Sequence, residues 1–290
     1  MAEILQFTFS GLTVGAVYAL VALGFTLIYN ASDVINFAQG EFVMLGGMTT
    51  VFLAAAGIPL PVAAVLAVAA TVGVGLLLWA LAIEPARGAT AVTLIIITIG
   101  ASIFLRGAAQ VIFDKQFHSL PPISGDSPIR LGGAAVLPQT FWVLGGAMAV
   151  LVALWAFLER TLSGKAVLAT AANRLAAKLV GVNTSLVVGL SFGVSAAIGA
   201  LAGILVTPIT LTSYDVGTLL ALKGFAAAML GGMGNPFGAV IGGLLVGLIE
   251  AYGAGLISSD YKDAFAFIVI LLVLFFMPAG LFGKRRVERV

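Results

Sequence analysis

The sequence predicts an all-α integral membrane protein with about nine transmembrane helices, and eight is the alternative count. Of its 290 residues, 61% are hydrophobic and only 9% are charged, whereas a soluble domain carries about 25% charged residues. The mean hydropathy is +1.17. Glycine occurs 36 times, which suits helices that pack closely in lipid. Charged residues this scarce cannot coat a water-exposed surface, so we expect one transmembrane domain over residues 1–290.

A transmembrane helix needs about 20 predominantly apolar residues. By that criterion the candidate spans are 7–29, 34–56, 60–83, 90–113, 137–158, 186–207, 216–234, 237–257 and 263–282. The second and seventh are the weakest, because the second begins with polar residues and the seventh is short and contains Lys223. The first is not a cleavable signal peptide, since Glu3 stands where a basic region is needed and the apolar run is too long.

Lysine and arginine near the span ends predict the orientation, because they concentrate on the cytoplasmic side. They occur in loop 84–90, in segment 159–185 and in the C-terminal GKRRVERV. Nine spans place all three in the cytoplasm and the N-terminus outside. If 216–234 were a re-entrant loop, the basic tail would lie outside, so nine spans are preferred. We expect a multi-pass membrane protein in contact with lipid.

Segment 114–136 is rich in Pro, Gly and Ser and has no helical period. It is therefore predicted to be an external loop packed on the outer mouth. The only histidine, His118, lies in it. A single histidine with no cysteine and no clustered carboxylates makes no metal site, so we interpret His118 as a surface residue.

No catalytic motif is present in the sequence. Gly164-Lys165 and Gly283-Lys284 lack the rest of a phosphate-binding loop, and no HExxH or GxSxG pattern occurs. There are no cysteines. We therefore expect no enzyme activity, cofactor, metal or nucleic-acid partner.

Four polar residues within the spans are candidates for a translocation pathway: Asn36, Gln39, Glu41 and Lys223. Ionisable groups in a membrane are costly and mark functional sites by default. A straight helix over 36–41 would bring Asn36 and Gln39 together but not Glu41, whereas an unwound start would let all three line a cavity. Structural hydrogen bonds between helices are the alternative. A pairing of Lys223 with Glu41 is a further hypothesis.

Met44–Met48 and Met229–Met233 share the sequence MLGGM, and each follows a stretch with intramembrane polar residues. Such an echo is typical of an internal repeat in transporters, although chance is the alternative. Small residues here would also allow close helix packing. The candidate packing glycines are Gly46, Gly47, Gly231, Gly232, Gly234 and Gly238.

Segment 159–183 is predicted to be a cytoplasmic helix that binds a partner. Gly164 and Gly181 bracket Lys165–Val180, which would span about 24 Å as one helix. Small side chains recur along one face, next to a basic pair, Arg174 and Lys178. A helix lying on anionic lipid is the alternative, but alanines anchor poorly in a membrane. The candidate contact residues are Gly164, Lys165, Ala169, Ala172, Asn173, Arg174, Ala176, Ala177, Lys178 and Gly181.

Several stretches resemble the permease subunits of bacterial branched-chain amino acid ABC importers, of the LivH type. They are Gly11–Met48, Leu94–Gly100, Gly181–Leu205, Leu222–Gly247 and Asp260–Gly283, in family order along nearly the whole chain. The resemblance implies an ABC importer permease fold. It also implies a second, homologous permease subunit, two cytoplasmic ATPases and a periplasmic binding protein that delivers Leu, Ile, Val or a related amino acid.

In such importers a cytoplasmic loop couples the permease to the ATPases, and the resemblance places it at Ser163–Asn183. Here Ala172-Asn173-Arg174 stands where an acidic residue is common, which puts a salt bridge to the ATPase in doubt. The family also includes importers of amides and urea, so the resemblance does not fix the substrate. An ion-coupled secondary transporter and a membrane scaffold without transport are the two rival hypotheses.

Overall fold

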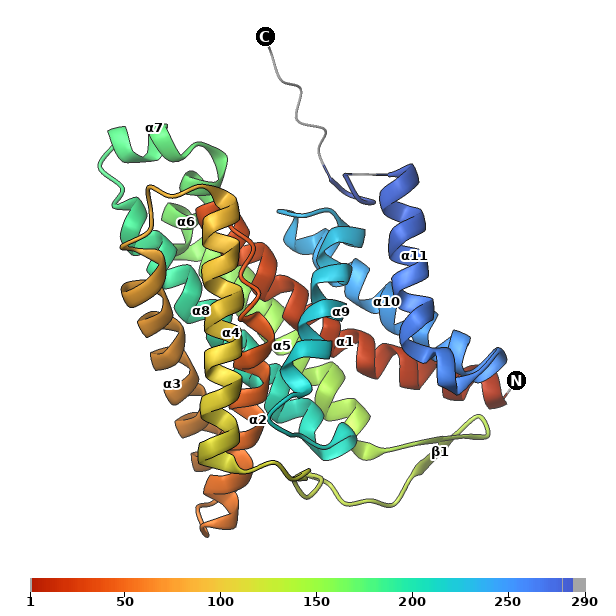
Figure 1. Ribbon diagram of the computed structural model, residues 1–290. Coiled ribbons are helices and arrows are strands. Elements are labelled where there is room, and N and C mark those ends of the chain that lie inside the picture. The colour runs from red at the N-terminus through yellow and green to blue at the C-terminus, as the bar shows by residue number, and fades with distance from the viewer. Residues whose placement is uncertain (1, 278, 284–290) are drawn as a thin grey trace.

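The computed structural model describes residues 2–277 and 279–283 as a bundle of α-helices (Figure 1). The long helices are α1 (Ala2–Ser32), α2 (Gln39–Ala55), α3 (Leu60–Leu78), α4 (Ala91–Phe113), α5 (Pro138–Arg160), α8 (Thr184–Thr210), α9 (Val216–Gly231), α10 (Pro236–Leu256) and α11 (Lys262–Phe276). The shorter elements are the π-helical turn η1 (Trp79–Ile83), strands β1 (Ile129–Leu131) and β2 (Ala134–Val136), helices α6 (Leu162–Ala172) and α7 (Arg174–Leu179), and the 3-10 turn η2 (Ser259–Tyr261).

Each predicted span overlaps one of the long helices, but the helices differ in length. By length and composition, six of them are suited to cross a membrane: α1, α3 with η1, α4, α5, α8 and α10. The helices in the second, seventh and ninth predicted spans have 17, 16 and 15 residues. The fold class is therefore confirmed as all-α and membrane-like, with six long apolar helices and three shorter ones.

Asparagine and threonine side chains begin several helices at the segment ends. Asn183 accepts from the backbone N–H groups of Ser185 and Leu186, and Asn235 does the same for Phe237 and Gly238. Thr90 caps α4 in the same manner. Such caps satisfy backbone donors that have no partner inside the helix, so these short polar stretches fix where each helix starts.

Helices α1 and α8 form the centre of the bundle. Both are largely buried, and α1 packs against α10, α8 and α9, while α8 also packs against α2 and α3. Helices α3, α4 and α5 expose most of their apolar side chains, including Val65, Phe104 and Val152. An apolar surface of this extent is suited to lipid rather than to water.

Glycines allow the helices to approach one another closely. A Cβ at Gly46 would meet the backbone of Ala200, and one at Gly231 or Gly238 would meet the backbone of the other. These three packing predictions are consistent with the structure, and Gly47 faces the Thr207 side chain instead. Gly232 and Gly234 have φ of +102° and +91° in the turn between α9 and α10, so there the backbone conformation requires glycine.

Residues 114–137 contain no helix, as predicted. Strands β1 and β2 form a small antiparallel hairpin, and the Gln6 side chain of α1 makes two hydrogen bonds to Ala135. His118 and Thr212 exchange backbone hydrogen bonds, which ties this loop to the α8–α9 connection. In Figure 1 the hairpin lies at the end of the molecule opposite α7.

The two MLGGM copies occupy different settings. Met44–Met48 lies inside α2, whereas Met229–Met233 runs past the last residue of α9 into a turn. The two copies of the MLGGM sequence therefore occupy non-equivalent positions in the described structure, and an internal repeat is not confirmed.

Candidate functional site

The polar start of the second span is unwound. Helix α1 ends at Ser32 and α2 begins only at Gln39, five residues later than the predicted start of this span. Asn36, Gln39 and Glu41 are all buried, with exposed fractions of 0, 0 and 1%. The break brings all three polar side chains into the bundle, which a straight helix would not do.

Gln39 is held in a hydrogen-bonded arrangement among three helices. The Ser195 hydroxyl of α8 lies 2.6 Å from Gln39 Oε1 and 2.9 Å from the carbonyl of Gly24 in α1, while the Gln39 amide donates to the carbonyl of Ser195 at 3.2 Å. A Cβ at Gly24 would clash with the Gln39 side chain. These contacts fit the structural alternative for Gln39, because its amide group is already occupied.

Glu41 has a different environment. The Ser102 hydroxyl of α4 donates to Glu41 Oε1 at 2.8 Å, and Arg106 Nε, one turn further along α4, lies 3.7 Å from the same oxygen. The second carboxylate oxygen, Oε2, has no hydrogen-bond partner and lies beside Gly217 in the first turn of α9. Sequence reasoning missed the roles of Ser102 and Arg106, although their four-residue spacing places them on one face of α4.

Lys223 does not pair with Glu41, so that hypothesis was wrong. Its ammonium lies 3.0 Å from Glu250 of α10 and 2.5 Å from Asp263 of α11, and over the ring of Tyr18. Tyr18 donates to Glu250 Oε2 at 2.8 Å, and Lys262 lies 3.1 Å from Oε1. Two lysines and two carboxylates thus balance in charge where four elements meet, which lowers the cost of burying them.

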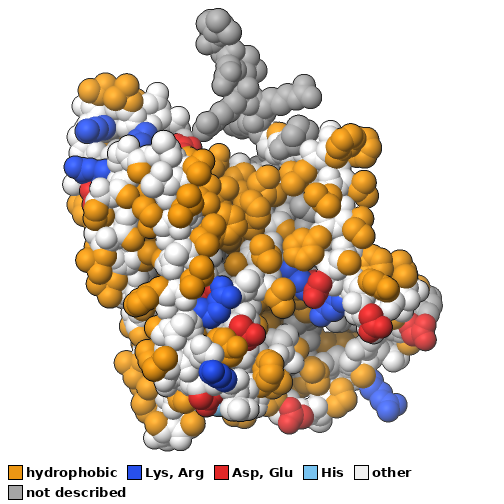
Figure 2. Space-filling view, viewed as in Figure 1, with side chains coloured by type: hydrophobic (Ala, Val, Ile, Leu, Met, Phe, Trp, Pro, Cys, Tyr) orange, Lys and Arg blue, Asp and Glu red, His pale blue; other side chains and the backbone are white. Residues whose placement is uncertain are grey.

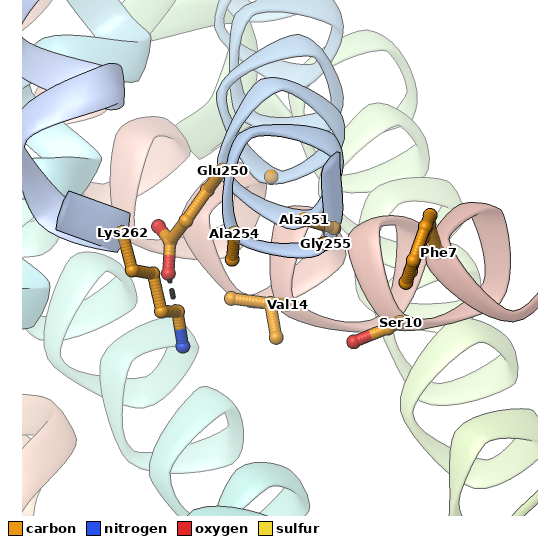
Figure 3. Close-up of a pocket in the computed structure, with 9 residues that line it drawn as sticks. Phe7, Ser10, Val14, Glu250, Ala251, Ala254, Gly255 and Lys262 are labelled. Carbon is orange, nitrogen blue, oxygen red and sulfur yellow. Dashed lines mark ion pairs between the residues drawn. The ribbon is translucent and has the colours of Figure 1, made fainter. Parts of the chain in front are cut away.

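A cavity of about 260 Å³ adjoins this charged group (Figure 3). Glu250 and Lys262 lie on one side of it, and Phe7, Ser10 and Val14 of α1 lie on the other. On the face seen in Figure 2, lysine, arginine and acidic side chains are visible in the lower half and at the upper left, among hydrophobic and uncharged side chains.

The predicted single helix over 165–180 is two helices. Helix α6 begins at Leu162, directly after its cap Thr161, and it ends at Ala172, before Asn173, whose backbone is extended. The Asn173 side chain then accepts from Ala176 N–H and starts α7. The expected continuous small-residue face is therefore broken, because a side chain that caps a new helix interrupts the old one.

Most of the predicted contact residues in this segment are exposed. Gly164 and Ala177 are the exceptions, since Gly164 packs on the backbone of Phe157 and Leu158 and Ala177 is buried. These two residues therefore pack inside the protein and are not part of the exposed surface of the segment. Three large apolar side chains are exposed on and beside α7: Leu175, Leu179 and Val180. Leu179 and Val180 belong to the face predicted from the three-to-four spacing, whereas Leu175 is not among the predicted contact residues.

Beside α6 lies a cavity of about 910 Å³ at the same end of the molecule. Its walls include Ala171 and Ala172 of α6, Leu158 of α5, and Met233 and Asn235 of the α9–α10 turn. Helix α6 therefore borders this cavity and also packs against α1, α5 and α8.

His118 has a carboxylate partner, contrary to expectation. Its Nε2 lies 3.0 Å from Asp114 Oδ1, and its ring packs edge-on against Phe52 at 5.0 Å between centroids. The Gln116 N–H and this histidine hold the pKa of Asp114 below its ordinary value. Among residues 2–277 and 279–283 no three His, Asp or Glu side chains are placed to hold a metal ion.

Comparison with known proteins identifies the family. Residues 7–274 match the family model described as the branched-chain amino acid transport system permease component. The chain belongs to this family. BraD of Pseudomonas aeruginosa, a high-affinity branched-chain amino acid transport system permease protein, is 34% identical over 99% of this chain and 98% of its own.

Two further permeases are similar to this chain at lower identity. LivH of Escherichia coli K12 is 32% identical over 99% of this permease and 97% of its own length. The ribose import permease protein RbsC of the same organism is 26% identical over 89% and 81%. The predicted resemblance is therefore confirmed: the permease is one component of a transport system, and an enzyme or a transporter of the ion-coupled class is not favoured.

Proposed function

We propose that this permease carries branched-chain amino acids across the bacterial inner membrane as part of an ATP-driven importer. The observation that carries the proposal is the match over nearly the entire length with BraD and LivH. A periplasmic binding protein delivers the amino acid, a second, homologous permease subunit completes the pathway, and two cytoplasmic ATPases drive it. RbsC, which is named for ribose, is more distant at 26% identity, which supports an amino acid over a sugar.

In this proposal the α6–α7 segment is the contact with an ATPase subunit. It carries an exposed basic pair, Arg174 and Lys178, next to the exposed apolar side chains Leu175 and Leu179. Exposed apolar groups at the centre of a polar rim are typical of a protein interface. The bend at Asn173 gives the segment two short arms in place of one long rod, which suits insertion into a groove.

The proposed topology has nine spans, with the N-terminus outside and the α6–α7 segment in the cytoplasm. Five helices, α1 to α5, separate these two parts of the chain, so they lie on opposite sides. The 114–136 loop is then external. The basic C-terminal tail falls outside the described residues, and we expect it in the cytoplasm on its charge alone.

The proposed pathway passes Glu41. The side chain of its neighbour Arg106 is 31% exposed, so the pair is within reach of a solute. Lys223 has a complete set of partners, so its part in the pathway is to fix the helices that border it. Asn36 and Gln39 hold the unwound start of α2 in place.

The test is purification of the complex from native membranes with a tag at the N-terminus. A second permease and P-loop ATPases should copurify. Ala172→Trp and Ala176→Trp, which enlarge exposed positions of the segment, should remove the ATPases and leave the second permease bound. Ala70→Trp enlarges an equally exposed alanine of α3 and should leave both partners bound.

ATPases that still copurify with both segment variants would contradict the assignment of α6–α7. A chain that purifies alone, and whose uptake in liposomes collapses with an uncoupler, would contradict the whole proposal in favour of ion-coupled transport. No solute flux with any combination of partners would favour the scaffold instead.

A further inference from the structure

Buried polar atoms without a hydrogen-bond partner gather where α2, α4 and α9 meet. Seven such side-chain atoms occur in the described residues. Two of them, Glu41 Oε2 and Arg106 Nε, belong to one ion pair between α2 and α4, and a third, Thr218 Oγ1, belongs to the residue that follows Gly217. The three helices come together where Gly40 of α2 crosses Gly217 of α9, with Glu41 Oε2 against Gly217. An unpaired buried polar group is costly, so a concentration of them at one crossing requires an explanation.

The unused bonding capacity at this crossing has a specific chemistry. Glu41 offers a carboxylate oxygen that accepts, Arg106 offers an N–H that donates, and the Thr218 hydroxyl can do either. Arg106 Nε and Glu41 Oε1 are 3.7 Å apart, which is too long for a hydrogen bond between them. The two charged groups therefore attract each other, while the Arg106 Nε–H and the Glu41 Oε2 atom remain able to form hydrogen bonds to another group.

One class of ligand satisfies both groups together. A ligand that carries an ammonium and a carboxylate on the same carbon presents N–H donors to Glu41 and oxygen acceptors to Arg106 at once. The α-amino acids have this arrangement, and charge-assisted hydrogen bonds are the strong ones. The surrounding helices are mainly apolar, so the side chain of such a ligand would meet no polar partner that selects it.

We propose that Glu41 and Arg106 form a transient binding site for the zwitterionic head group of the transported α-amino acid. Glu41 binds the ammonium, Arg106 binds the carboxylate, and Ser102 orients Glu41 through its 2.8 Å hydrogen bond. Arg106 is the entry side, because it is partly exposed whereas Glu41 is 1% exposed. This inference rests on the proposed function and adds that the permease itself recognises the head group.

The first experiment measures thermal melting of the purified complex without its binding protein. Millimolar L-leucine should raise the melting temperature, because a ligand that binds only the folded state stabilises it. 4-Methylpentanoate lacks the ammonium and isoamylamine lacks the carboxylate, so neither should reproduce the shift. Glu41→Gln and Arg106→Gln should each abolish the shift with L-leucine.

The second experiment measures ATP-driven uptake of L-leucine in proteoliposomes that contain the complete importer. Each variant should lose about tenfold or more of the rate, as expected when one charge-assisted hydrogen bond is removed. Glu84→Gln and Arg87→Gln are the matched controls, because they break an exposed carboxylate–guanidinium pair with a 2.8 Å contact. Both should retain the wild-type shift and rate.

An L-leucine shift that survives in the variants, an equal shift with isoamylamine, or wild-type uptake in both variants would overturn the inference and leave the proposed function standing. The proposed function fails separately, if the wild-type importer shows no ATP-dependent uptake. Should Glu41→Gln not assemble, Arg106→Gln decides the question, because the Arg106 side chain is partly exposed.

Discussion

At the scale of single residues, the same side-chain types serve different purposes in different surroundings. Lys223 and Glu41 were both singled out because ionisable groups are rare in a membrane. Lys223 contacts two carboxylates and the ring of Tyr18, whereas Glu41 keeps an unpaired oxygen. The first group pairs each lysine with a carboxylate and stabilises the fold, whereas the second leaves a carboxylate oxygen available to a ligand.

Lys223→Met should therefore destabilise the complex. Breaking a buried ion pair leaves uncompensated charge and costs about 3–5 kcal/mol, so the melting temperature should fall clearly. Lys262→Met removes a half-exposed partner of Glu250 and should cost about 0–1 kcal/mol. Lys223→Met combined with Glu250→Gln should cost less than Lys223→Met alone, since no buried carboxylate remains at that position. Equal melting of the wild type and Lys223→Met would contradict a structural role.

Asp114 should make the start of the 114–136 loop sensitive to acid. Its carboxylate accepts from Gln116 N–H and contacts His118, which lowers its pKa in the folded state. A lowered folded pKa gives a contribution that is present above the ordinary Asp value, about 3.9, and is lost as the pH falls through the folded value. Hydrogen exchange at residues 114–118, corrected for intrinsic rates, should accelerate in that acidic range. Asp114→Asn should remove the pH dependence, and a wild-type profile in this variant would exclude the carboxylate as its source.

At the scale of elements, close helix crossings depend on a few glycines. Gly231 of α9 and Gly238 of α10 lie against each other's backbone, and Gly242 lies against Ala227. Gly40 and Gly217 allow a similar approach of α2 and α9, next to Glu41. Without a hydrophobic driving force between helices in lipid, this close packing is what holds them together.

Gly238→Leu should lower both the yield and the melting temperature of the folded complex. The new side chain would collide with the backbone of Gly231, and overpacking costs about 1–3 kcal/mol or more. Gly100→Leu is the matched control, because a Cβ at this glycine of α4 meets nothing within 4 Å. It should leave both quantities unchanged. Similar losses in the two variants would show that leucine itself, and not the crossing, is responsible.

At the scale of the whole molecule, the α6–α7 segment with its basic pair lies at one end of the bundle and the β1–β2 hairpin lies at the other (Figure 1). The proposed function places the ATPases at the first end and the binding protein at the second.

Single cysteines should report the two sides directly, because the natural chain has none. In intact cells with a permeable outer membrane, a membrane-impermeant maleimide should label Ser127→Cys and Glu3→Cys. Ser163→Cys should react only after the inner membrane is opened. Labelling of positions 3 and 163 from the same side would contradict an odd number of crossings between them and hence the proposed topology.

The sequence by itself determined the class of the protein. Its composition leaves too few charges to coat a soluble domain, and its apolar runs repeat at the length of a membrane. Stretches such as Gly11–Met48 then indicated the permease family. These features are local or additive, so they can be assessed without knowing which residues meet.

Only the tertiary structure decided which polar groups are partners. Glu41 faces Ser102 and Arg106 from α4, and Lys223 faces Glu250 and Asp263 from α10 and α11. These pairs join residues that are far apart along the chain, and a charge in a low-dielectric interior is governed by its nearest neighbours. The break between α6 and α7 also became visible only in the structure. The Asn173 side chain can either follow a continuous helix or cap a new one, and the sequence does not say which.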